Sequence, residues 1–447
     1  MALFSRLLLA LAAVLLVAVT GEADSGGGQA WFDRVFSFGD SLTDTGNSAI
    51  LPATAGGPFT NAPYGQTHFK RPGAGGRASN VVVDSIVELL KLPYLASRSV
   101  DGFRRRSLTD TRNAAILPAT ARSGQTRLKS TSNRASDGRL VIDFIVESLE
   151  LPQPTPYLAG KTANDFLQGV NFAVGGATAL DMAFLKSKGI TSFVPISLSN
   201  QTTWFNGVLK LLNSTRNEQR KMMASSLFYI GEIGFNDYSF ALMNNDTAGL
   251  AESLVPDIIR VIRSALIDVI DAGARRIVVA GMIPMGCEPE LLALLPSGAS
   301  GYYDTESGCI ARFNRLAQLH NRALNRMLSK LRRAYRRTSI YYGDLYTPVT
   351  AIVSSPGEYG FGSEPLAACC GGGGGPYNFN FAFFCGTPLS TTCADPSKSV
   401  SWDGIHYTEA ANKFVADTMF NGLLEEFDAS TSMLEEFDPS TSTSSRK

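Results

Sequence analysis

Short apolar runs recur along the chain, each bounded by small or polar residues. Five of them are candidates for buried β-strands: Val35–Phe38, Val170–Ala173, Leu227–Ile230, Ile277–Ala280 and Ile340–Tyr342. Helical apolar patterns separate these runs, most clearly at Leu254–Ala272 and Cys309–Tyr335. Buried strands that alternate with amphipathic helices predict a doubly wound α/β fold with a parallel sheet. No linker divides the core, so we expect one domain over residues 30–422.

Small polar turns follow the first three runs. Ser41 follows the first run in FGDSLTDTGN, Gly175 and Gly176 follow the second in GVNFAVGGAT, and Asn236 follows the third in GEIGFND. The carboxyl ends of parallel strands meet at one edge of a sheet, where ligands of such folds bind. Taken singly, these residues are ordinary helix caps and turn formers. Together they predict a site at that edge.

A histidine that could serve this site lies far downstream. The chain has three histidines, His68, His320 and His406, and only His406 has a carboxylate three residues earlier, Asp403. A serine hydroxyl is a poor nucleophile until an imidazole takes its proton, and a carboxylate fixes the tautomer of that imidazole. Ser41, His406 and Asp403 therefore form a candidate catalytic triad. His320 has no such carboxylate, and we expect it to be structural.

Four sequence blocks, FGDSLTDTGN, GVNFAVGGAT, GEIGFND and WDGIHYT, occur in this order. They resemble the signature blocks of plant GDSL esterase/lipases of the SGNH hydrolase superfamily, over about residues 35–420. The resemblance implies a flavodoxin-like three-layer α/β/α sandwich with a five-stranded parallel sheet. It assigns the nucleophile to Ser41, the rest of the triad to Asp403 and His406, and the oxyanion hole to Ser41, Gly176 and Asn236, with Gly175 as an alternative to Gly176. It also suggests a disulfide between Cys287 and Cys309.

The resemblance implies a secreted serine esterase that hydrolyses carboxylic esters through an acyl-enzyme. Small acyl esters or acetylated glycans are the preferred substrates, and a polymeric ester remains open. Two alternatives remain: an acyltransferase that uses the same triad, and a catalytically impaired scaffold that binds glycan. We expect no cofactor, no metal and a monomer. The chain has 40 basic and 40 acidic residues, so its charge indicates neither nucleic acid nor an anionic membrane as a partner.

Several features indicate the secretory pathway. Residues 1–23 contain an uncharged apolar stretch, Leu7–Val19, which is typical of a signal peptide and short for a membrane span. Six cysteines, an even number, favour disulfides in an oxidising compartment, and the adjacent Cys369 and Cys370 more naturally find separate partners. Glycosylation sequons begin at Asn200, Asn213 and Asn245. We therefore expect an extracellular protein of the apoplast or cell wall. Residues 423–447 are predicted to form a disordered acidic tail rich in Ser and Thr.

One segment is duplicated. Ser41–Ala55 and Ser107–Ala121 agree at thirteen of fifteen positions. The second copy has FRRRS before its serine, and three arginines cannot line a buried strand without partners, so Ser107 is not expected to be a nucleophile. That copy nevertheless retains the SDGRLVIDF block that the resemblance requires. We therefore predict a composite domain, with the strand and serine from the first copy, the helix at Leu140–Leu151 from the second, and an insertion at about residues 56–121.

Overall fold

The computed structural model describes residues 32–68, 133–245, 248–420 and 422. All of them belong to the unit that begins at Phe32. The expected signal peptide at 1–23 and the tail at 423–447 lie outside the described residues. The same holds for most of the predicted insertion, including Ser107 and the first copy's candidate helix, Val81–Leu92.

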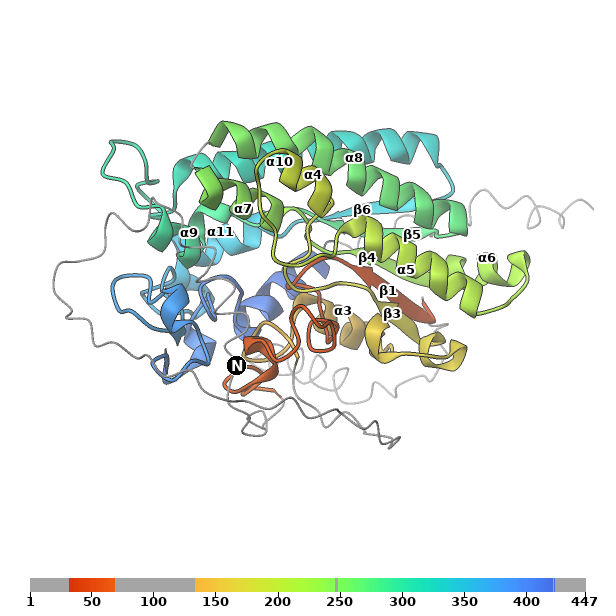
Figure 1. Cartoon of the computed structure of the whole chain (residues 1–447), viewed down its shortest axis with the longest axis horizontal. Coiled ribbons are helices and arrows are strands. Elements are labelled where there is room, and N and C mark those ends of the chain that lie inside the picture. Colours follow the sequence, from red (N-terminus) through yellow and green to blue (C-terminus); the bar gives the residue numbers. More distant parts are fainter. Residues whose placement is uncertain (1–31, 69–132, 246–247, 421, 423–447) are drawn as a thin grey trace, which may run out of the picture. The chain divides into compact units, whose positions relative to one another are not determined.

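The centre of the domain is a sheet of six parallel strands (Figure 1). Their order is β2–β3–β1–β4–β5–β6. The strands are β1 (Arg34–Phe38), β2 (Thr155–Pro156), β3 (Gly169–Asn171), β4 (Ser226–Ile230), β5 (Arg276–Ala280) and β6 (Ser339–Gly343). The five predicted strands are confirmed. The sixth, β2, is a two-residue edge strand that contains a proline, and it has no apolar run that could have revealed it.

The sheet is covered on both faces, which explains why its strands are continuously apolar. Neighbouring residues of a strand point to opposite faces. In β4, Phe228 packs edge-on against Phe205 of α5 (Leu198–Leu211), with ring centroids 5.9 Å apart. The next residue, Tyr229, faces a small cavity that it shares with Val141 and Val415. Helix α5 therefore covers one face, and α3 (Val141–Ser148) with the helix at 409–420 covers the other.

The remaining helices complete the two outer layers (Figure 1). They are α4 (Met182–Ser187), α6 (Arg216–Ala224), α7 (Phe235–Asn245), α8 (Ala248–Ala272), α9 (Pro289–Leu294), α10 (Ala311–Ala334) and α11 (Tyr346–Ser354). Helices α8 and α10 correspond to the two long helices predicted from the sequence. The fold is thus the predicted α/β/α arrangement. In the described part of the chain, no helix combines the length and apolarity that crossing a membrane requires.

Helix α3 comes from the second copy of the duplicated segment, as predicted, whereas β1 comes from the first. Arg134 holds the start of α3 through two bonds of 2.6 Å to the carboxylate of Asp143. Asp143 in turn accepts the Leu140 N–H at 2.8 Å and so caps the helix. The first copy lies beside this point, since the Thr67 N–H donates to the Asp137 carbonyl at 2.8 Å.

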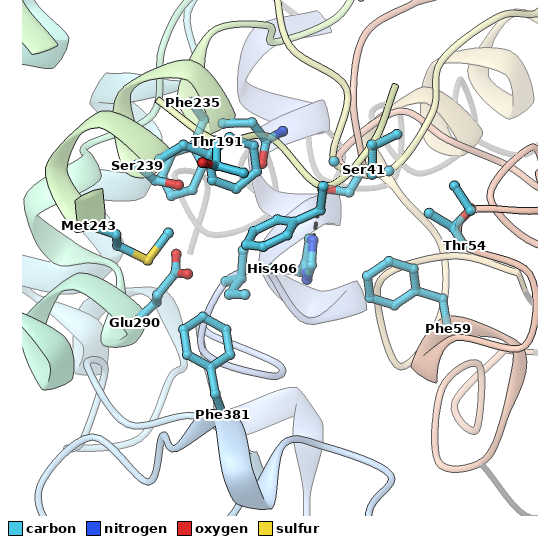
Figure 2. A pocket seen from close by; sticks show the side chains of 18 of the residues that line it. Ser41, Thr54, Phe59, Thr191, Phe235, Ser239, Met243, Glu290, Phe381 and His406 are labelled. Atoms are coloured by element: carbon cyan, nitrogen blue, oxygen red, sulfur yellow. Dashed lines mark hydrogen bonds between the residues drawn. The ribbon is translucent and has the colours of Figure 1, made fainter. Parts of the chain in front are cut away.

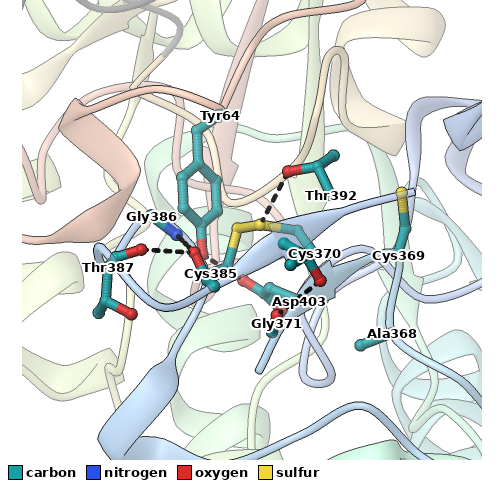
Figure 3. Close-up of a disulfide and its surroundings, with 12 residues drawn as sticks. Tyr64, Ala368, Cys369, Cys370, Gly371, Cys385, Gly386, Thr387, Thr392 and Asp403 are labelled. Atoms are coloured by element: carbon teal, nitrogen blue, oxygen red, sulfur yellow. Dashed lines mark hydrogen bonds between the residues drawn. A yellow bond between two sulfur atoms is a disulfide. The ribbon is translucent and has the colours of Figure 1, made fainter. Parts of the chain in front are cut away.

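Three disulfides connect the six cysteines. Cys287 pairs with Cys309, as the resemblance suggested, and the adjacent Cys369 and Cys370 pair separately with Cys393 and Cys385. The last two bonds close the glycine-rich loop around a small antiparallel pair, β7 (Cys370–Gly371) and β8 (Thr391–Thr392). Figure 3 shows the Cys370–Cys385 disulfide beside Tyr64 and Asp403. The hairpin is also bonded to the segment before Asp403, because the Cys370 N–H donates to the Trp402 carbonyl at 2.6 Å.

Candidate active site

Ser41 lies in a tight turn immediately after β1, at the carboxyl edge of the sheet. The turn is closed by the Asp40 carbonyl, which accepts the N–H groups of Thr43 and Asp44 at 3.1 and 2.9 Å. Gly39 starts it with a φ of 142°, and a Cβ there would lie 3.2 Å from the Glu232 carbonyl oxygen. Glycine is required at this position because the backbone is both left-handed and crowded. The turn therefore presents the Ser41 hydroxyl at a fixed place.

The structure brings Ser41, His406 and Asp403 into one hydrogen-bonded chain, and Figure 2 shows its bond between Ser41 and His406. The Ser41 Oγ is 2.8 Å from His406 Nε2, and His406 Nδ1 is 2.9 and 2.8 Å from the two carboxylate oxygens of Asp403. Asp403 is fully buried, whereas Ser41 keeps 6% of its surface exposed. This geometry allows the imidazole to take the serine proton while the carboxylate stabilises the resulting imidazolium.

Asp403 has further donors that hold it in place. Its Oδ1 accepts the backbone N–H groups of Ile405 and His406 at 3.0 and 2.9 Å, and its Oδ2 accepts the hydroxyl of Tyr64 at 2.8 Å. Burial and the nearby Asp403 charge keep the pKa of Tyr64 well above its usual range, so its hydroxyl remains a donor. Phe59 packs edge-on against the His406 ring, with centroids 5.2 Å apart.

Tyr64 and Phe59 contact the candidate triad, and sequence reasoning missed both of them. Both lie within residues 56–121, where we predicted an insertion. One feature of the sequence could have indicated that these residues belong to the domain. GQT at Gly65 recurs at Gly124, so the first copy continues past Tyr64. Gly65 and Thr67 are bonded through their N–H groups to the carbonyls of Ser136 and Asp137. The first copy thus remains part of the domain up to this junction.

We predict that Tyr64→Phe lowers kcat about tenfold and leaves KM nearly unchanged. The variant removes one donor from a buried carboxylate, and a hydrogen bond to a charged group contributes about 1.5–3 kcal/mol. KM should not change because Tyr64 does not line the cavity described below. Steady-state kinetics with p-nitrophenyl acetate measure both constants. Tyr346→Phe, which removes a hydroxyl bonded to Gln318 on another surface, is the matched control. An unchanged kcat in a folded Tyr64→Phe protein would contradict this role.

The predicted oxyanion donors lie beside Ser41. The Gly175 N–H is engaged, since it donates to Asp44 Oδ2 and Ser48 Oγ at 2.9 and 2.7 Å. Gly176 follows with a φ of 79° and lines the same cavity as Ser41. In the described part of the chain, its N–H donates to no acceptor. This arrangement favours Gly176 over Gly175 as a donor to a substrate oxygen.

Asn236 is held against the turn that precedes Ser41. Its Nδ2 donates to Asp40 Oδ2 and to the Ala177 carbonyl, both at 3.0 Å. Both amide hydrogens therefore have acceptors, and donation to a substrate oxygen requires one of these bonds to be shared. Burial raises the pKa of Asp40 to about 6, and burial together with the Asp40 charge raises that of Glu232 well above its usual range. The carboxyl group of Asp40 thus orients the side chain of Asn236.

Buried carboxylates also fix the three loops relative to one another. Asp44 accepts the N–H groups of Gly46, Asn47 and Ser48 in its own turn, and that of Gly175 in the loop after β3. Asp237, at the start of α7, accepts the N–H groups of Ala179 and Leu180 at 2.8 and 2.9 Å. Each carboxylate binds several backbone donors at once, so the loops after β1, β3 and β4 are positioned as a unit.

The other candidate residues lie away from this centre. His320 is buried on α10, where its Nδ1 lies 2.9 Å from the Tyr238 hydroxyl, and burial lowers its pKa to about 4. It is therefore a neutral core residue, in agreement with the structural role expected. Asn200 and Asn213 are exposed at the two ends of α5, whereas the side chain of Asn245 lies outside the described residues. Glycosylation at the three sequons remains a prediction.

A cavity of about 180 Å³ opens beside the Ser41 hydroxyl (Figure 2). Its walls are mainly aromatic and aliphatic, and its lining includes His406, Gly176 and Asn236. The carboxylate of Glu290, on α9, also belongs to the lining. A concave apolar site with a few convergent polar groups is typical of a small-molecule binding site.

A parallel α/β sheet that presents a serine, a histidine and an aspartate at its carboxyl edge is an architecture of serine hydrolases. Comparison with known sequences specifies the class. The sequence profile of the GDSL-like Lipase/Acylhydrolase family matches residues 35–419. The chain belongs to this family and is a carboxylic ester hydrolase.

Curated relatives from plants agree with this assignment. Two GDSL esterase/lipases of Arabidopsis thaliana are 35% and 39% identical over 392 and 394 residues, which cover 88% and 87% of this chain and 84% and 86% of theirs. A protein named sinapine esterase, from Brassica napus, is 40% identical over 311 residues, or 69% of this chain and 78% of its own. The similarity therefore extends over most of the described domain.

Proposed function

We propose that the protein hydrolyses carboxylic esters through an acyl-enzyme on Ser41. The observation that supports this most directly is the continuous set of hydrogen bonds from Ser41 Oγ through His406 to Asp403. In the first step His406 takes the serine proton, Oγ bonds to the carbonyl carbon, and the protonated imidazole returns the proton to the departing alcohol. In the second step a water attacks the acyl-enzyme with His406 again as the base. The products are the acid and the free enzyme.

The negative charge that develops on the carbonyl oxygen requires fixed donors. We assign this role to the backbone N–H groups of Ser41 and Gly176 and to the side-chain amide of Asn236. Preorganised donors stabilise the transition state more than the ground state, and the loss of one commonly lowers the rate ~10²–10³-fold. Asn236 is preorganised by Asp40 and Ala177.

Small acyl esters are the substrate class that the cavity supports. Its volume of about 180 Å³ lies below the ~300–1,000 Å³ typical of sites for drug-sized ligands. This size favours a short acyl group with a compact alcohol. Sinapine, the ester in the name of one relative, has a larger acyl group and would test this size limit.

We further propose that the enzyme acts outside the cell, in the apoplast or cell wall. Three disulfides support this location, because such bonds persist in oxidising compartments. The apolar stretch within residues 1–23 and the exposed sequons at Asn200 and Asn213 agree with it. The domain would span residues 30–422 as predicted. We place the insertion after Thr67 rather than at Gly56, because the preceding residues contact the triad.

Labelling with a fluorophosphonate probe tests the proposed mechanism directly. The probe reacts with activated serines, so we expect stoichiometric modification of the peptide that contains Ser41. Boiled protein and the intact chain pretreated with a serine-hydrolase inhibitor serve as controls. A folded protein that binds glycan but does not label would support the impaired scaffold instead. Product analysis in the presence of alcohols separates hydrolysis from acyl transfer.

A further inference from the structure

The cavity beside Ser41 contains one carboxylate that the proposed hydrolysis does not use. Glu290 lies in the first turn of α9, and its backbone N–H donates to the Gly404 carbonyl at 2.9 Å. This bond fixes the glutamate to the short segment between Asp403 and His406. The side chain is only 3% exposed, yet it belongs to the lining of the cavity. Figure 2 shows its carboxylate directed between Met243 and Phe381.

Glu290 has no cationic partner in the described part of the chain. Its Oε2 is buried and accepts no hydrogen bond there, and no ion pair involves it. The described residues that line the cavity include neither lysine nor arginine. Burial, with a smaller contribution from the Asp403 charge, raises the pKa of Glu290 to about 8. A buried carboxylate without a partner is strongly disfavoured in its charged form, and a bound cation would remove that penalty.

The aromatic part of the lining suits a quaternary ammonium cation. Six apolar side chains of the lining are aromatic or contain sulfur: Phe59, Phe193, Phe235, Phe240, Met243 and Phe381. Aromatic faces attract a quaternary ammonium group through their quadrupoles, and such groups are recognised by aromatic pockets. Glu290 and the aromatic walls together therefore fit a trimethylammonium group.

We propose that Glu290 determines specificity, and that the cavity accepts esters whose alcohol contains a quaternary ammonium group. This inference rests on the proposed esterase function of the same cavity. The acyl carbonyl would lie at Ser41 and the cationic end of the alcohol at Glu290, so that the charged alcohol is the group that leaves. Other ionisable groups near Glu290 are Asp403, His406 and the neighbouring Glu288.

The test compares acetylcholine with 3,3-dimethylbutyl acetate, a neutral ester of the same shape in which carbon replaces nitrogen. We expect the full-length protein to show at least about a tenfold higher kcat/KM for acetylcholine, since each 1.4 kcal/mol of preferential binding is tenfold. Glu290→Gln keeps the shape of the side chain without its charge, and should bring the ratio close to one. The ratio for the unaltered protein should rise as the pH increases towards 9, because Glu290 becomes ionised. Effects of Asp403, His406 and Glu288 on catalysis cancel in this ratio.

Glu288→Gln is the matched control. Glu288 is also buried, but it accepts the Tyr407 hydroxyl at 2.6 Å and does not line the cavity. This variant should keep the preference for acetylcholine. A preference that survives in Glu290→Gln, or equal rates for the two esters with the unaltered protein, would overturn the proposal. If the preference survives in Glu290→Gln, a hydroxyl-rich substrate is the better candidate, because the glutamine side chain can still form hydrogen bonds with hydroxyl groups.

A binding experiment keeps this inference separate from the proposed hydrolysis. Calorimetric titration requires no catalysis. The intact protein and Glu290→Gln are each titrated with choline and with the neutral alcohol 3,3-dimethylbutan-1-ol. Choline binding that is lost in Glu290→Gln, with weak binding of the neutral alcohol, supports the proposal even if no ester is cleaved. The absence of choline binding in a protein that hydrolyses p-nitrophenyl acetate overturns it while the esterase function stands.

Discussion

Ser41→Ala is expected to lower kcat for p-nitrophenyl acetate about 10⁴- to 10⁶-fold, because the nucleophile and the acyl-enzyme are both lost. KM should change little, since the cavity walls remain. The His406 ring should stay in place through its two contacts with Asp403. The measurement is steady-state hydrolysis, accompanied by a thermal unfolding curve to show that the variant is folded.

Ser107→Ala is the matched control for this experiment. Ser107 occupies the same position in the second copy of the duplicated segment as Ser41 in the first. If only Ser41 is the nucleophile, Ser107→Ala retains full activity. Activity that persists in a folded Ser41→Ala protein but falls in Ser107→Ala would show that the second copy supplies the nucleophile instead.

Deletion of residues 56–121 is expected to abolish activity, whereas deletion of residues 77–133 should preserve it within about threefold. The first deletion removes Phe59, which packs against His406, and Tyr64, which donates to Asp403. The buried Asp403 carboxylate would then lack one hydrogen-bond donor. The second joins Gly76 to Arg134, where the two copies align at RAS. Residues 69–76 remain as a link, and an extended chain spans ~3.3–3.6 Å per residue. This link is long enough because its two ends are close together, as the bond between Thr67 and Asp137 shows. A shorter loop also costs less closure entropy.

Activity and thermal unfolding of both deletion variants check this expectation. Loss of activity in the 77–133 deletion, in a protein that still folds, would show that the inserted residues contribute to the site. Retention of activity in the 56–121 deletion would contradict the role assigned to Tyr64. If the shorter chain is more active than the full one, the duplication impairs an otherwise competent enzyme.

The sequence predicted the sheet well because its signal was local. Each buried strand is a continuous apolar run, and this pattern results directly from burial on both faces. The positions of Ser41, Gly176 and Asn236 at the ends of three such runs follow from parallel topology alone. His406 and Asp403 could be proposed because the chain has few histidines. The contacts between these residues depend on the packing of loops, and the sequence alone does not specify that packing.

What the sequence did not indicate depends on tertiary structure. Tyr64 is an ordinary tyrosine in a duplicated stretch until its hydroxyl is seen 2.8 Å from Asp403, 339 positions away. Glu290, in CEPELL, has the pattern of an exposed helix start, and only its burial identifies it as unusual. Strand β2 is too short to have a periodicity. In each case the deciding contact is between residues that are distant in sequence, which no local pattern encodes.

The hydrogen bond between Ser41 and His406 joins residues 365 positions apart. A ribosome therefore produces the nucleophile early and its base late, after every strand of the sheet. Until the segment with Asp403 and His406 emerges and docks against β1, Ser41 is an ordinary alcohol with no means of losing its proton. Esterase activity thus begins with the completion of the fold, and an incompletely synthesised chain cannot attack the esters that it meets on its way.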